Sequence, residues 1–260
     1  MRALWTILLT CAAACAVRAE VVTQPVEYKD GDALLEGAWV FDASAAEKRP
    51  GVLLVPDWMG PSPYYAEKAA ELVKLGYVAL MVDMYGKEVR PKSPQEAGEQ
   101  AGKWKNDRPG MRRRMNLALE LLKAHAKVDA QRTAAIGYCF GGTCVLELAR
   151  SGADVTGIAS FHGGLGTPAP EDAKQIKARV LVLHGADDPH VPESEVLAFQ
   201  KEMRDAKVDW QMVSYGGAVH SFTKPAAGND PSKGSAYEAK ADHRSWAAMT
   251  SFFAEIFKAP

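Results

Sequence analysis

The chain has 260 residues, of which 47% are hydrophobic and 24% charged, which is enough apolar material for one large domain with its own core. Lys and Arg total 31 against 32 Asp and Glu, a formal net charge of −1. A surface so balanced offers no general attraction to polyanions, and nucleic acid is therefore not an expected partner.

The first 19 residues, MRALWTILLTCAAACAVRA, have the pattern of a secretory signal peptide. Arg2 precedes an apolar run, and Val17 and Ala19 follow it at the small-residue spacing of a cleavage site. That run is shorter than the ~20 residues of a spanning helix, and no later run reaches this length. The sequence thus predicts a signal peptide at 1–19, a domain at 20–260, no membrane span, and a periplasmic or secreted location.

A lipid anchor on Cys15 is the minority alternative, because "AAAC" resembles a lipidation box only in part. Cys11 and Cys15 belong to the leader, so Cys139 and Cys144 are the cysteines of the domain. Five positions apart in one expected helical stretch, these two point to different faces and are poorly placed for a disulfide. A free thiol in an oxidising compartment calls for a functional reason.

Short apolar runs alternate with longer segments of helical periodicity along the rest of the chain. The predicted strands are 37–42, 51–57, 77–85, 132–139, 155–164, 178–185 and 209–217. The predicted helices are 64–76, 93–107, 111–127, 141–152, 192–206 and 237–257. This alternation predicts the α/β class: a single, mostly parallel sheet with helices on both faces. Ligands of such sheets bind beyond the carboxyl ends of the strands.

The basic run RRR at 112–114 opens one of these amphipathic segments. The simplest interpretation is a solvated helix face and not a polyanion-binding patch.

"IGYCFGG", residues 136–142, joins a predicted strand to a predicted helix with glycines on both sides of Cys139. A side chain at such a sharp turn stands exposed above the sheet, and the helix N-terminus favours a thiolate over a thiol. Cys139 is thus a candidate nucleophile. The alternative is a buried structural cysteine beside packing glycines. Neither a phosphate loop nor a dinucleotide-binding turn fits these letters.

A nucleophile needs a base and the base an orienting acid, which this topology supplies in the chain order nucleophile, acid, His. Asp187 and Asp188 follow the predicted strand 178–185, and His220 follows the next strand. At that place His220 is the candidate base, and either aspartate could orient it.

These motifs resemble those of the dienelactone hydrolases, cysteine members of the α/β-hydrolase fold; the likeness runs from about Val52 to Phe253 and rests on "GYCFGG", "GADDPHVP" and "GGAVHSF". The resemblance selects Asp188 as the acid and leaves Asp187 as a loop or capping residue. It also matches Asp57 to an acidic residue that influences the protonation of the thiol; the alternative role for an aspartate at this position is a helix cap or a loop hydrogen bond.

General chemistry assigns the oxyanion of the reaction to the backbone N–H groups of Trp58 and Phe140. The resemblance further places two substrate-binding arginines at positions held here by Lys87 and Lys224. Lysine keeps the charge but not the planar fork of arginine, and both could equally be surface lysines. His162 lies near the end of the predicted strand 155–164, where it would line the pocket or act as a spacer.

The sequence therefore predicts an exported, thiol-dependent hydrolase of small carboxylic esters or lactones, anionic ones included, with the triad Cys139, His220 and Asp188. No metal or organic cofactor is expected, because no ligand spacing for a metal is present, and a monomer is favoured. One alternative is a generalist esterase with the same residues. The other is a non-catalytic module of the same fold that binds a small acid or senses redox state through its thiol.

Overall fold

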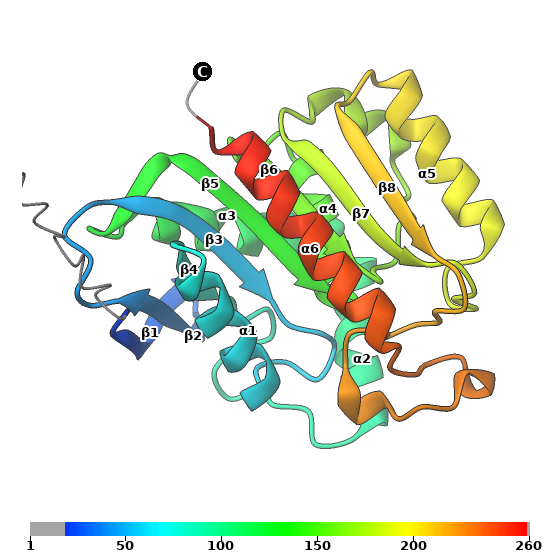
Figure 1. The fold of residues 1–260 in the computed structure, drawn as a ribbon, viewed down its shortest axis with the longest axis horizontal. Helices are drawn as coiled ribbons and strands as arrows, with labels where there is room; N and C mark the ends of the chain where they lie inside the picture. The colour runs from blue at the N-terminus through cyan, green and yellow to red at the C-terminus, as the bar shows by residue number, and fades with distance from the viewer. Residues whose placement is uncertain (1–18, 259–260) are drawn as a thin grey trace, which may run out of the picture.

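A computed structural model describes residues 19–258, which form one eight-stranded sheet with helices packed on both of its faces (Figure 1). The sheet order is β1-β2-β4-β3-β5-β6-β7-β8; β1 and β2 are antiparallel to their neighbours, and the remaining pairs are parallel. The strands are β1 (Val21–Asp30), β2 (Ala33–Asp42), β3 (Arg49–Val55), β4 (Val78–Met81), β5 (Val128–Tyr138), β6 (Gly157–Phe161), β7 (Arg179–Gly185) and β8 (Trp210–Tyr215). The predicted fold class is confirmed. Residues 1–18 of the predicted signal peptide, Cys15 among them, lie outside the described residues.

Two helices cover one face of the sheet and the remaining α-helices cover the other. The helices are α1 (Pro63–Lys74), α2 (Pro94–Asn106), α3 (Arg108–Ala124), α4 (Phe140–Arg150), α5 (Glu193–Asp205) and α6 (Ala239–Ile256), with short 3₁₀ turns η1 (Pro170–Gln175), η2 (Pro225–Ala227) and η3 (Pro231–Lys233). Helices α1 and α6 lie on the face toward the viewer in Figure 1. Helices α2 to α5 pack against the other face.

Alternation along the central strands supplies both cores. Val52 and Leu54 of β3 pack in the core beneath α1 and α6, whereas Leu53 and Val55 pack in the core beneath α3 and α4. All four side chains are fully buried. A strand covered on both faces must be apolar at every position, which explains the continuous apolar run "VLLV".

The N-terminal strand β1 was absent from the sequence prediction. Its ten residues include Pro25 and several polar side chains, and it forms the edge of the sheet, where Pro is tolerated because one side makes no ladder hydrogen bonds. Strand β4 is also shorter than the predicted segment 77–85. Asp83 ends it early, since its Oδ1 accepts the N–H groups of Tyr85 and Gly86 at 3.0 Å each and turns the chain.

The prediction of a solvated face for the basic run 112–114 holds for Arg113, whose side chain is 58% exposed, and is wrong for Arg114, which is buried. All three guanidinium groups are ion-paired. Arg112 binds Glu147 and Asp172, and Arg113 binds Asp30. Arg114 is buried, with Nε 2.8 Å from Asp30 Oδ2 and Nη1 donating to the carbonyls of Met84 and Tyr85. The run therefore fastens α3 to the β1 edge and to the segment after β4.

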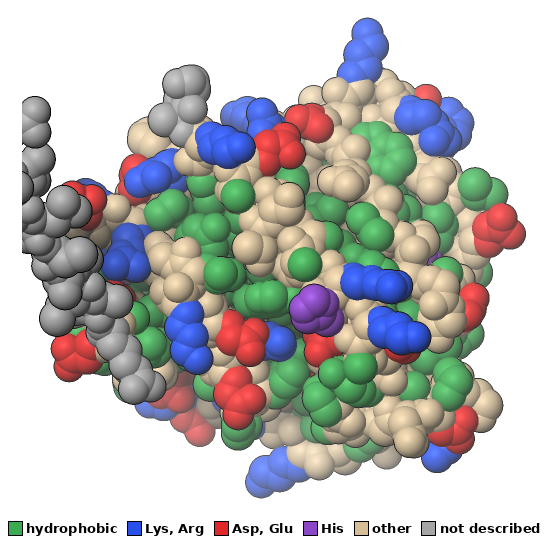
Figure 2. All heavy atoms as spheres, viewed as in Figure 1, with side chains coloured by type: hydrophobic (Ala, Val, Ile, Leu, Met, Phe, Trp, Pro, Cys, Tyr) green, Lys and Arg blue, Asp and Glu red, His purple; other side chains and the backbone are tan. Residues whose placement is uncertain are grey.

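Charged side chains of both signs are interspersed on the face of the molecule in Figure 2. Within residues 19–258, no helix is long and apolar enough to cross a membrane.

Candidate active site

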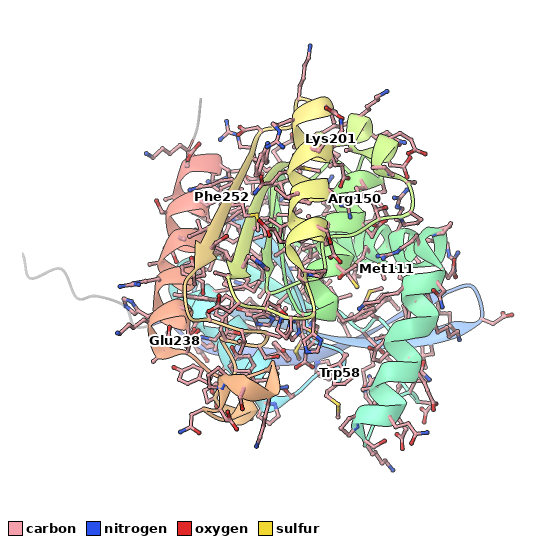
Figure 3. All side chains as sticks on the ribbon, turned by 90° about the vertical axis from the view of Figure 1, so that its right-hand side faces the viewer. Trp58, Met111, Arg150, Lys201, Glu238 and Phe252 are labelled. Carbon is pink, nitrogen blue, oxygen red and sulfur yellow. The ribbon has the colours of Figure 1, made fainter. Side chains whose placement is uncertain are left out.

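The candidate site lies where the chain reverses its direction of travel across the sheet. Strands β3 and β5 are neighbours, but the chain passes outward from β3 to β4 and in the opposite direction from β5 to β6. Such a switch point leaves a crevice at the carboxyl ends of the strands. In Figure 3 the arrows of β7 and β8 point toward the end of the molecule where Trp58, which follows β3, is labelled.

Cys139 forms the sharp turn between β5 and α4. Its backbone has φ 54° and ψ −114°, a sparsely populated conformation for a residue with a Cβ. Hydrogen bonds hold it there: its N–H donates to the carbonyl of Phe161 at 3.0 Å, and its carbonyl accepts the N–H of Gly142 at 3.0 Å. The surroundings thus impose a turn that presents the sulfur above the sheet, partly exposed.

Two glycines permit this close passage of helix over strand. A Cβ on Gly137 would lie 2.0 Å from the carbonyl oxygen of Gly141, and a Cβ on Gly142 would lie 2.8 Å from Cα of Gly163. Neither contact is possible for a larger residue without a backbone shift. The glycine spacing of the motif therefore follows from packing at the turn.

Sulfur, imidazole and carboxylate form one hydrogen-bonded chain at this place. Cys139 Sγ lies 3.0 Å from His220 Nε2, and His220 Nδ1 lies 2.8 Å from Asp188 Oδ2. The Asp188 side chain is fully buried, and its Oδ1 accepts the N–H of His190 at 2.8 Å. Asp187 instead accepts the N–H of Gly217 at 3.1 Å and so secures the neighbouring loop. The structure brings together the three side chains that the sequence predicted, from the ends of β5, β7 and β8.

The environment of His220 favours its protonated form. Burial by itself lowers the pKa of the imidazole, but the hydrogen bonds with Asp188 and Cys139 and their negative charges outweigh burial and raise the pKa to about 10. The backbone of His220 is fixed on both sides, since its N–H donates to Gly234 and its carbonyl accepts from Ala236. By contrast, burial raises the pKa of the Cys144 thiol, which has no contact with an imidazole.

A pocket of about 260 Å³ opens onto the sulfur. It is lined by Trp58, Lys105, Cys139, Phe140, Gly164, His190, Val191, His220, Ser221 and Ser235. Its size suits a small ligand.

The two expected oxyanion donors both lie at this pocket. Trp58 follows β3 and Phe140 is the first residue of α4, so the switch point brings them together beside Cys139. Within residues 19–258, neither backbone N–H has a hydrogen-bond acceptor. Both donors are thus available to a ligand oxygen.

Asp57 and Lys224 form a partly buried ion pair. Lys224 Nζ lies 2.5 Å from Asp57 Oδ2, and Asp57 Oδ1 accepts the N–H of Met59 at 2.9 Å. The aspartate therefore caps its own loop, which is one of the two predicted roles, and it also neutralises the lysine. Its influence on the thiol stays a prediction.

The expected substrate-binding residues Lys87, Lys224 and His162 are not among the residues that line the pocket, and their role in binding stays a prediction. Lys87 is ion-paired with Glu27 and, at 3.3 Å, with Glu36, on the outer side of the β1–β2 hairpin. His162 is 2% exposed, and its Nε2 lies 2.9 Å from Thr223 Oγ1. Its ring packs behind His220, and burial lowers its pKa well below the ordinary value.

Sequence reasoning missed several pocket residues, chiefly Lys105, His190, Ser221 and Ser235. Lys105 is in the last turn of α2, and Ser235 follows the 3₁₀ turn η3. No local pattern distinguishes such residues, because they reach the pocket only through the packing of distant loops. Nowhere between residues 19 and 258 do three His, Cys, Asp or Glu side chains gather as a metal-binding group.

The doubly covered parallel sheet and the Cys–His–Asp chain above it are those of an α/β hydrolase. The chain belongs to the dienelactone hydrolase family, whose model matches residues 37–257. It is thus a hydrolase that acts on ester bonds.

Solved structures and a curated relative agree with this assignment. The protein m3DLH is 41% identical, with a TM-score of 0.88 over 92% of this chain and 99% of its own. A dienelactone hydrolase-like promiscuous phosphotriesterase from metagenomic libraries is also 41% identical, with a TM-score of 0.86 over 93% of this chain and 100% of its own. A probable 2-oxo-3-(5-oxofuran-2-ylidene)propanoate lactonase of Bradyrhizobium sp. is 30% identical over 183 residues, 66% of this chain and 73% of that protein.

Proposed function

We propose that this protein is an exported, thiol-dependent hydrolase of small carboxylic esters or lactones, with Cys139 as nucleophile, His220 as acid and base, and Asp188 as the orienting carboxylate. The observation that carries the proposal is the continuous chain from sulfur to imidazole to carboxylate, with contacts of 3.0 and 2.8 Å, at the end of the pocket. The signal-peptide pattern of residues 1–19 supports export, and the lactonase name of the Bradyrhizobium relative supports the substrate class.

Acylation begins with the proton on His220 and the negative charge on sulfur, an arrangement that the raised pKa of the imidazole supports. The Cys139 sulfur attacks the carbonyl carbon and forms a C–S bond. The oxyanion accepts hydrogen bonds from the free backbone N–H groups of Trp58 and Phe140. The C–O bond then breaks, the leaving alkoxide takes the proton of His220, and a thioester remains.

Deacylation needs the opposite behaviour from the same imidazole. A thioester sulfur carries no negative charge, so the part of the raised pKa that comes from Cys139 disappears on acylation. Neutral His220 can then take a proton from water as hydroxide adds to the thioester carbon. The C–S bond breaks, the acid leaves, and the original ion pair reforms. Asp188 holds Nδ1 throughout, which fixes Nε2 toward the reacting atoms.

The ion pair of Asp57 and Lys224 is proposed to regulate the thiol from one side. Paired with an ammonium at 2.5 Å, the carboxylate contributes little negative potential at the sulfur. If a bound ligand drew Lys224 away, the unpaired negative charge of Asp57 would favour the protonated form of the groups around it.

Replacement of each cysteine separately tests the proposal. Cys139→Ala should abolish hydrolysis of 4-nitrophenyl acetate, whereas Cys144→Ala, which alters a buried thiol on α4, should retain activity. Circular dichroism would verify that both variants are folded. Equal activity of the two variants would refute the role of Cys139 as the nucleophile. It would favour the alternative of a small-acid-binding or redox-sensing module.

A further inference from the structure

The cations that could recognise an anionic substrate differ in whether their charge is already neutralised. Lys87 is held by Glu27 and Glu36, and Lys224 is held by Asp57. Each of these ammonium groups would have to leave a carboxylate before it could bind another. Neither lies on the pocket that holds Cys139.

Lys105 is in the opposite situation. It lines the same pocket as Cys139 and His220, and in the described part of the chain its ammonium makes no ion pair and no hydrogen bond. It stands in the last turn of α2, an exposed position from which a long side chain reaches the mouth of the pocket. An unpaired ammonium at the entrance of a reactive cleft attracts anions, and it need not leave a carboxylate partner before it binds one.

A second cavity gives an anionic group room beside this lysine. It has a volume of about 400 Å³ and shares Lys105, Gly164 and His190 with the first pocket, so the two adjoin. Arg108 also lines the second cavity; Glu147 lies 3.7 Å from its Nη1 but is paired more closely with Arg112 and Arg150. The acid of this cavity, Glu195, is turned to the backbone, where its Oε1 accepts the N–H groups of Leu165 and Gly166.

From this arrangement we propose that Lys105 is the specificity-determining cation of the enzyme, and that it binds a carboxylate carried by an ester or lactone whose carbonyl carbon lies at Cys139. The inference rests on the proposed function. It transfers recognition of the anion from the ends of the strands, where Lys87 and Lys224 are neutralised, to the C-terminal end of α2.

Two matched pairs of substrates test the proposal. One pair carries the carboxylate on the leaving group, 4-acetoxybenzoate and its methyl ester; the other carries it on the acyl group, mono-4-nitrophenyl adipate and 4-nitrophenyl valerate. The readout is the ratio of kcat/KM for the anionic and neutral member of each pair. In Lys105→Met this ratio should fall about three- to tenfold in at least one pair, the range expected for a partly solvated ion pair, and Lys105→Arg should restore it.

Lys103→Met is the matched control. Lys103 is on the same helix and is also exposed, but its ammonium lies over the ring of Trp104, 5.9 Å from the centroid, and does not line either cavity. Its ratios should equal those of the wild type. Salt at 0.5 M should reduce the wild-type ratio, since it screens an exposed charge.

The outcomes separate the two proposals. Unchanged ratios for Lys105→Met in both pairs, with hydrolysis that still requires Cys139, would overturn the role of Lys105 and leave the proposed function intact. Hydrolysis of neither pair by the wild type would overturn both. A loss of thermal stability in Lys105→Met with unchanged ratios would indicate only a structural role at the end of the helix.

Discussion

The strained turn at Cys139 predicts an inversion of the usual stability order of alanine and glycine. At φ 54° and ψ −114°, the backbone of a residue with a Cβ is strained by about 1–3 kcal/mol, whereas glycine adopts this conformation without that strain. Glycine ordinarily costs about 0.5–1 kcal/mol relative to alanine because it loses more entropy on folding. Both replacements remove the sulfur, so the loss of its contact with His220 is common to the two variants and cancels from the difference in their stability. Cys139→Gly should therefore be more stable than Cys139→Ala by about 1 kcal/mol.

Urea unfolding of the two variants measures this difference, and for a chain of this size it corresponds to about 2–4 °C in Tm. The control is the same pair of replacements at Cys144, in the interior of α4, where Ala should be more stable than Gly by about 1 kcal/mol. If Ala were also the more stable residue at position 139, the turn would store no strain and the reasoning would fail.

Two further predictions concern the packing of the turn and the proton on His220. Gly142→Ala would place a Cβ 2.5 Å from Ser160 Oγ and 2.8 Å from Gly163 Cα. Urea unfolding should therefore show that the free energy of unfolding falls by about 1–3 kcal/mol, and kcat should fall because the start of α4 moves. Wild-type values of both quantities would refute the close packing. Asp188→Asn should lower the pKa of His220 from about 10 in an NMR titration, since it removes a hydrogen-bonded negative charge. The pKa of a free imidazole is about 6.5, so the stability contributed by protonated His220 is complete below that pH and is lost as the pH rises through 10. The unfolding free energy should therefore fall more steeply over this interval in the wild type than in His220→Gln. Parallel profiles of the two proteins would contradict the raised pKa.

Local sequence patterns were sufficient for the parts of the fold that depend on burial. The apolar run of β3 and the glycine spacing around Cys139 each have a cause within a few residues: a strand covered on both faces and a helix that crosses a strand closely. The places of Cys139 and His220 were predictable because parallel strands deliver their carboxyl ends to one edge. The choice of Asp188 over Asp187 came from the resemblance to the dienelactone hydrolases.

Charge pairing was not predictable, because it depends on residues distant in sequence. Arg114 is buried against Asp30, which lies on a strand that the sequence did not reveal, and Lys87 is paired with carboxylates of the same hairpin. Whether Lys87, Lys224 or Lys105 keeps a free charge is decided by such partners and not by local sequence. The substrate-binding residues were therefore the least predictable part of the site.

The most direct test of the account is to identify the residue that carries the acyl group during turnover. Mass spectrometry of peptides from enzyme quenched in acid with 4-nitrophenyl acetate should find the acetyl group on Cys139, as a thioester that hydroxylamine removes, and none on the buried Cys144. An acetyl group on any other residue in enzyme that is turning over, with Cys139 unmodified, would contradict the proposed mechanism.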